Sequence, residues 1–119
     1  MNRQTHIVIG VVLFLIYLYL TGFFHSPSGE LFVFGIFAVA AGSICPDILE
    51  PATSAQHRRF FHSWRTLKFV AVFFLITAIP VLFALSVPHF PLVFSGSCFF
   101  LGYSAHLLAD STTRAGLPR

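Results

Sequence analysis

Charged side chains are scarce in this sequence. Of its 119 residues only 9% are Asp, Glu, Lys or Arg, whereas 56% are hydrophobic and 16 are Phe. A soluble domain carries about 25% charged residues, and a chain this short could not bury so much apolar surface in one core. The composition therefore excludes an ordinary soluble domain and favours a protein solvated by lipid, with most Phe side chains as lipid-facing bulk.

The sequence also lacks the features of two other protein classes. Its formal net charge is +3, but no basic stripe with interleaved aromatic residues is present, so we expect no nucleic-acid partner. The two cysteines, Cys45 and Cys98, form neither a metal-type pair nor a disulfide framework. We find no internal repeat.

Four stretches contain no charged side chain, and three of them reach the length of about 17–25 residues that a spanning helix needs. They are Ile7–Phe24, Leu31–Cys45, Phe69–Val87 and Phe90–Ala109. We therefore predict an all-α bundle of four transmembrane helices in one domain, residues 1–119. The approximate spans are 6–24, 28–45, 67–87 and 90–110, the second being short, and the lipid bilayer is the surrounding partner.

The connections between these spans differ in length. Two are tight turns, whereas Pro46–Leu67 is a long polar loop between the second and third spans. The first span follows Arg3 as a signal peptide would. Its apolar run is long, however, and Gly22-Phe23-Phe24-His25 offers no small-x-small cleavage site, so we expect it to stay as a helix.

The basic residues predict the orientation in the membrane. Four spans place both termini and the long loop on one side, which then holds all seven Lys and Arg side chains, whereas Glu30 lies on the other side. Positive residues mark the cytoplasmic face. The sequence thus predicts a multi-pass membrane protein with both termini in the cytoplasm.

The same topology gathers ionisable residues at the cytoplasmic surface. His6 begins the first helix, Asp47 and Glu50 follow the second, and the fourth ends with His106 and Asp110. The ends of a four-helix bundle bring such residues within reach of one another, which is a usual place for a metal site. The alternative is that the carboxylates cap helix ends and that the imidazole makes an ordinary interior hydrogen bond.

His106 and Asp110 are four residues apart, so both project from one face of the fourth helix. Gly102 continues this stripe and would let a neighbouring helix approach closely, as would Gly35, Ala38, Ala41 and Gly42 in the second span. Imidazole and carboxylate ligands without paired thiols suit zinc or manganese. Ionisable residues at membrane depth are costly, which makes them candidates for function.

The long loop carries His57 and His62, with Arg58 and Arg59 between. The histidines are five positions apart and would lie on different faces of a helix, so a loop or turn would have to bring them together. The two arginines allow two interpretations: a guanidinium clamp on a phosphate or carboxylate, or cytoplasmic charge that meets anionic lipid headgroups.

Three motifs together resemble a known family, the bacterial membrane-bound metal-dependent hydrolases, whose best-known member is a LexA-regulated inner-membrane protein. They are Pro46-Asp47, His57-Arg58-Arg59-Phe60-Phe61-His62-Ser63, and Gly102-Tyr103-Ser104-Ala105-His106-Leu107-Leu108-Ala109-Asp110 with Thr113 and Gly116. The resemblance implies a location in the bacterial inner membrane and metal binding at His6, Asp47, His57, His62, His106 and Asp110. It also implies a distant similarity to zinc-dependent phospholipase C and single-strand nucleases, and hence phosphoester hydrolysis.

The chain departs from the family pattern beside its first acid. The family often has a second acid two residues after the first, whereas here Glu50 comes three residues after Asp47. We expect a metal-dependent hydrolase acting on a phosphoester, with a lipid headgroup as the first substrate class to test. Glu50 or Asp47 would accept the proton, and Arg58 or Arg59 would hold substrate charge. The alternative is a non-catalytic protein with a structural or sensory metal site.

Overall fold

The computed structural model describes residues 2–25, 27–51, 60–113 and 116–118, which form four α-helices and one short 3-10 turn with no strand among them. The helices are α1 (Arg3–Leu20), α2 (Gly29–Leu49), α3 (Trp64–Leu82) and α4 (Phe90–Ser111), and the turn η1 spans Phe23–His25. At 18 to 22 residues, all four are long and apolar enough to cross a membrane. The predicted all-α membrane bundle is confirmed.

Short polar side chains begin three of these helices. Asn2, Ser28 and Ser63 each accept a hydrogen bond from the backbone N–H three residues on, which satisfies a donor that the helix itself cannot. α4 begins differently, at His89 in the left-handed conformation with Pro91 in its first turn.

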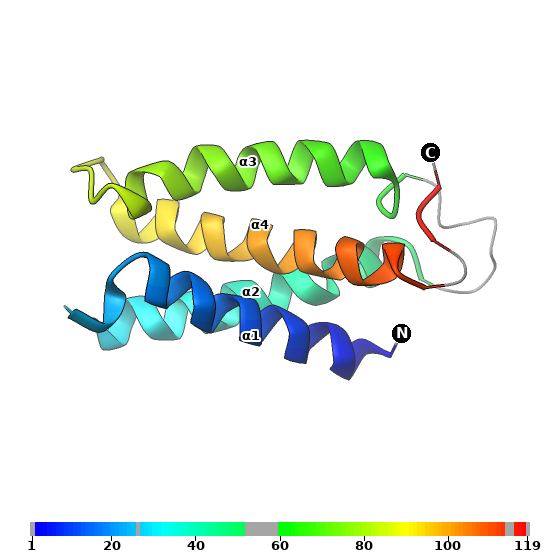
Figure 1. Ribbon diagram of the computed structural model, residues 1–119, viewed down its shortest axis with the longest axis horizontal. Coiled ribbons are helices and arrows are strands. Elements are labelled where there is room, and N and C mark those ends of the chain that lie inside the picture. Colours follow the sequence, from blue (N-terminus) through cyan, green and yellow to red (C-terminus); the bar gives the residue numbers. More distant parts are fainter. Residues whose placement is uncertain (1, 26, 52–59, 114–115, 119) are drawn as a thin grey trace.

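α4 lies at the centre of the bundle and contacts each of the other three helices (Figure 1). Its contact with α2 is the most extensive, because two glycines remove side chains where the backbones meet. A Cβ atom on Gly42 would overlap the carbonyl oxygen of Phe99, and one on Gly102 would overlap that of Val39. The close approach predicted at these glycines is confirmed, whereas Ala41 points outward.

The helix boundaries differ from the predicted spans mainly in α2. This helix continues through Pro46 to Leu49 and is 21 residues long, so the second span is not short and Asp47 lies in its last turn. Proline removes one N–H donor from a helix, but the turn around it stays closed, since the Glu50 N–H donates to the Pro46 carbonyl over 2.9 Å. α1 ends at Leu20 and α3 at Leu82, both earlier than expected.

The bundle places α1's start, α2's end, α3's start and α4's end together at one end, where both chain termini also lie (Figure 1). We call this the polar end, and the end with η1 and the α3–α4 connection the opposite end. The sequence predicts that most Phe side chains face lipid. Phe14 and Phe94, however, are buried in the core. Many others, such as Phe37, are exposed on the outer surface, as a lipid-solvated protein requires.

Candidate metal centre

Five side chains meet inside the polar end, from three helices and from the segment before α3. They are His6 of α1, Asp47 of α2, His62, and His106 and Asp110 of α4. They form two overlapping groups, His6–Asp47–His106 and His62–His106–Asp110, in each of which the possible ligand atoms lie within 4.8 Å of one another. The structure therefore contains His/Asp groups that could hold a metal ion.

The shortest contacts run between imidazole nitrogens and carboxylate oxygens. Asp110 Oδ2 lies 3.3 Å from His106 Nε2, and Asp110 Oδ1 lies 3.3 Å from His6 Nε2. Asp47 Oδ1 lies 3.4 Å from His62 Nε2 and 3.7 Å from His106 Nε2. The His6 and His106 rings stack with their centroids 3.8 Å apart. Asp47 thus faces two imidazoles, and Asp110 faces three, because its Oδ2 also lies 3.8 Å from His62 Nε2.

The cluster is almost fully enclosed. His6, His62 and His106 are each exposed by 1% or less, and the side chain of Asp110 by 6%. Asp47 is the most accessible member, with 17% of its side chain exposed. Access to the centre therefore runs past Asp47.

A backbone carbonyl orients His106. Its Nδ1 lies 2.6 Å from the carbonyl oxygen of Ser43 in α2. A carbonyl can only accept a hydrogen bond, so Nδ1 carries a proton; in the neutral ring, Nε2 then presents a lone pair to the cluster. This arrangement, in which one ring nitrogen donates to a fixed acceptor and the other faces the site, is typical of metal-binding histidines.

Glu50 orients His62 in the same way. Its Oε2 lies 3.1 Å from His62 Nδ1, and the carboxylate also accepts the backbone N–H groups of Phe60 and His62. Burial raises the pKa of Glu50, but hydrogen bonds from the backbone N–H groups of Phe61, Phe60 and His62 and from the His62 ring outweigh it, and the net effect lowers that pKa. Glu50 is therefore ionised and accepts a hydrogen bond from His62 Nδ1, so in the neutral ring the lone pair of His62 Nε2 faces the cluster.

These two orientations direct two imidazole nitrogens toward the carboxylates of the cluster. The Nε2 atoms of His62 and His106 lie 3.3 Å apart, and in the neutral rings both would present lone pairs toward carboxylate oxygens of Asp47 and Asp110. Lone pairs that face one another repel unless a proton or a metal ion lies between them. A divalent metal ion prefers imidazole nitrogen and carboxylate oxygen and could occupy this position. The donor set therefore fits a metal.

The structure brings together most of the residues singled out in the sequence. His6, Asp47, His62, His106 and Asp110 converge, whereas Glu50 lies on the outer side of His62 and belongs to neither metal-binding group. His57, Arg58 and Arg59 lie outside the described residues. The Ser43 carbonyl was not foreseen, because a backbone acceptor has no signature in the sequence.

The fold and this cluster define a class: a multi-pass helical membrane protein with a buried His–Asp centre at one end of its bundle. Sequence comparison then identifies the family. The family described as YdjM inner membrane protein matches residues 1–119, and the chain belongs to it. The protein is thus a multi-pass protein of the inner membrane. No curated protein and no solved structure matched the chain.

Proposed function

We propose that this protein is a metal-dependent hydrolase that cleaves a phosphoester at the cytoplasmic surface of the inner membrane. The observation that supports it best is the pair of imidazole Nε2 atoms, 3.3 Å apart, that face two carboxylates in a buried site. Ionisable groups buried at membrane depth are costly, which makes this site a candidate for function. Zinc suits these ligands, and manganese is the second choice.

The distribution of charge supports a cytoplasmic polar end. Arg3, Arg65 and Lys68 are exposed at that end, whereas Glu30 is exposed at the opposite end. Positive side chains are retained on the cytoplasmic side of inner-membrane proteins. Reporter fusions after Arg119 and within the turn between α1 and α2 should therefore report opposite compartments.

Each residue of the centre has a proposed task. His6, His62, His106, Asp47 and Asp110 would hold the metal, which supplies Lewis acidity to a water molecule and to a phosphoryl oxygen. Asp47, the most exposed of the five, would accept the proton of the attacking water. Glu50 acts as a positioning residue through His62, a role that its hydrogen bond favours over that of a proton acceptor. His57 stays a sixth candidate ligand.

Arg58 and Arg59 would bind the negative charge of the substrate. Guanidinium groups stay protonated and offer no lone pair to a metal, so they can contact the substrate without competing for the ion. A charge-assisted contact of this kind contributes about 1.5–3 kcal/mol, or roughly 10- to 150-fold in turnover per residue.

A second candidate, a structural or sensory metal site, is favoured by the burial of the centre. Three of the five possible ligands are exposed by 1% or less, and a structural site keeps no open coordination position. Under this alternative the metal would hold α1, α2 and α4 together at the polar end, and no substrate would be turned over.

Turnover by variants that keep their metal separates the two candidates. We expect Arg58→Gln with Arg59→Gln to keep metal content and fold while phosphoester hydrolysis in lipid falls severely. Arg65→Gln with Lys68→Gln removes the same charge from exposed positions on α3 and should leave turnover unchanged. If no phosphoester, ester or amide is hydrolysed by metal-loaded wild-type protein, the structural candidate replaces the enzyme.

A further inference from the structure

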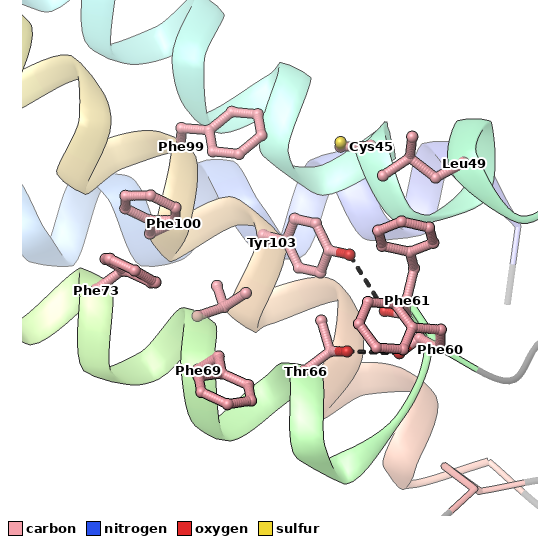
Figure 2. Close-up of a pocket in the computed structure, with 11 residues that line it drawn as sticks. Cys45, Leu49, Phe60, Phe61, Thr66, Phe69, Phe73, Phe99, Phe100 and Tyr103 are labelled. Carbon is pink, nitrogen blue, oxygen red and sulfur yellow. Dashed lines mark hydrogen bonds between the residues drawn. The ribbon is translucent and has the colours of Figure 1, made fainter.

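A second feature of the polar half is a groove of about 430 Å³ between α2 and α3, with α4 as its floor (Figure 2). Its walls are apolar, and six of the eleven lining residues are phenylalanines: Phe60, Phe61, Phe69, Phe73, Phe99 and Phe100. The volume lies in the range of about 300–1,000 Å³ that small-molecule sites occupy. The groove could therefore hold one elongated apolar group.

The groove is open toward the surrounding lipid. Leu49, Phe69 and Phe73 line it and are 47%, 67% and 51% exposed on the outside of the bundle. From Thr66 to Phe73 it follows α3 for roughly 10 Å at 1.5 Å per residue, about a third of the ~30 Å hydrocarbon core. A hydrocarbon chain can enter it sideways from the bilayer without passing through water.

One end of the groove adjoins the candidate metal centre through a shared segment. Phe60 and Phe61 line the groove, and the next residue, His62, faces the centre. Hydrogen bonds fix this segment from both sides. The Tyr103 hydroxyl donates to the Phe61 carbonyl (Figure 2), and the Phe60 N–H donates to Glu50. The groove and the centre therefore adjoin, as the apolar chain and the polar head of one bound molecule would require.

We propose that the groove binds one acyl chain of a membrane phospholipid whose headgroup phosphate lies at the metal centre. This inference rests on the proposed function and narrows its substrate to a membrane phospholipid. The continuity of groove and centre through Phe61 and His62 supports it, together with the opening at bilayer depth. A water-soluble phosphoester would gain nothing from an apolar groove that opens into lipid.

Photolabelling of the wild-type protein tests the occupant. The protein would be placed in vesicles of phosphatidylethanolamine and phosphatidylglycerol that contain phosphatidylethanolamine with a diazirine on one acyl chain. We expect adducts on Phe60 and Phe69 to exceed those on Phe37 and Phe83, although all four are similarly exposed, at 66%, 67%, 71% and 72%. Equal labelling of the four would overturn the proposal.

Variants that fill the groove test its link to the reaction. Cys45→Phe from the α2 wall and Val70→Phe from the α3 wall each add a ring to the groove, whereas Val72→Phe adds the same ring to the lipid-facing side of α3. We expect the first two to lower groove labelling and to reduce kcat/KM for a long-chain phospholipid roughly tenfold. Their activity on a water-soluble short-chain phosphoester should match that of Val72→Phe and wild type. Equal losses on both substrates would overturn the proposal.

The outcomes separate the groove from the hydrolase. If Phe60 and Phe69 are preferentially labelled but no phosphoester is cleaved, the groove is supported as a lipid site and the hydrolase is overturned. If a short-chain phosphoester is cleaved but labelling is uniform, the hydrolase is supported and the groove inference is overturned.

Discussion

The two ends of the bundle carry the same kinds of ionisable side chain and treat them in opposite ways. At the opposite end, His25, Glu30 and His89 are all exposed. At the polar end, three histidines and Asp110 are buried together, although the interior of this helix bundle is otherwise mostly apolar. Residue type alone therefore does not mark a site in this protein.

The difference between the two ends shows where a functional site lowers the stability of the fold. An exposed imidazole costs the fold nothing, whereas buried carboxylates and imidazoles must be compensated by partners. Asp110 faces His6 and His106 over 3.3 Å each, and such interdependence makes the polar end sensitive to single changes. Each of the first three predictions below compares a residue of the polar end with a counterpart of the same type elsewhere in the bundle.

The largest effect is expected from His106→Ala. This change removes a member of both candidate ligand groups, so metal content should fall to background while helicity and gel-filtration behaviour persist. His89→Ala, at the other end of the same helix, should leave metal content unchanged. Elemental analysis of the purified variants is the measurement, and equal metal in His106→Ala and wild type would exclude His106 as a required ligand.

Glycine substitutions in α4 come next. Gly102→Ala places a Cβ against the Val39 carbonyl and should separate α2 from α4, with a loss of about 1–3 kcal/mol of stability and weaker metal binding. Gly96→Ala meets no atom within 4 Å and should be neutral or stabilise by up to about 1 kcal/mol, because alanine favours the helix. Thermal denaturation in detergent measures both, and equal effects at the two positions would contradict the close α2–α4 contact.

A smaller effect is expected from Glu50→Gln. The neutral amide orients His62 less strongly than the carboxylate does, and loss of such a partner typically lowers metal affinity about 10- to 100-fold. Glu30→Gln, in the first turn of the same helix, should change nothing. Metal titration with a competing chelator distinguishes the two variants. An unchanged affinity in Glu50→Gln would show that His62 is not held through Glu50.

The smallest effect is expected from Tyr17→Phe, which alters a buried polar pair in the opposite half. The Ser97 hydroxyl donates to the Phe94 carbonyl, so the Tyr17 hydroxyl donates to Ser97 Oγ over 2.8 Å. Its loss leaves Ser97 with a partner and should cost about 0.6 kcal/mol, the average for hydrogen bonds between membrane helices. Metal content should not change, and a loss of metal would show that the two halves are coupled.

Hydropathy and topology predicted much of the fold and of the candidate site. Charge-free stretches gave the four helices, because lipid requires each span to be apolar over its whole length. The same topology placed His6, Asp47 and His106 at one end. Helix spacing also paired His106 with Asp110, and that pair lies 3.3 Å apart.

The features that were not predicted depend on three-dimensional contacts. Pro46 indicated the start of a loop, yet α2 continues through it, since tertiary packing can outweigh local propensity. The Ser43 carbonyl and the role of Glu50 follow from which backbone lies beside which ring. Phe99 and Phe100 are apolar, as lipid-facing residues are, and only the position of α3 shows that they line a groove.

The order of the cluster residues along the chain has a consequence for biosynthesis. His6 belongs to α1, which leaves the ribosome before α4, and Asp110 belongs to the last turn of α4. Until α4 has entered the membrane, His6 lacks its carboxylate and Asp47 lacks the imidazole of His106. A nascent chain with three helices inserted therefore cannot assemble the centre, and acquisition of an ion would mark the moment at which insertion of the fourth helix is complete.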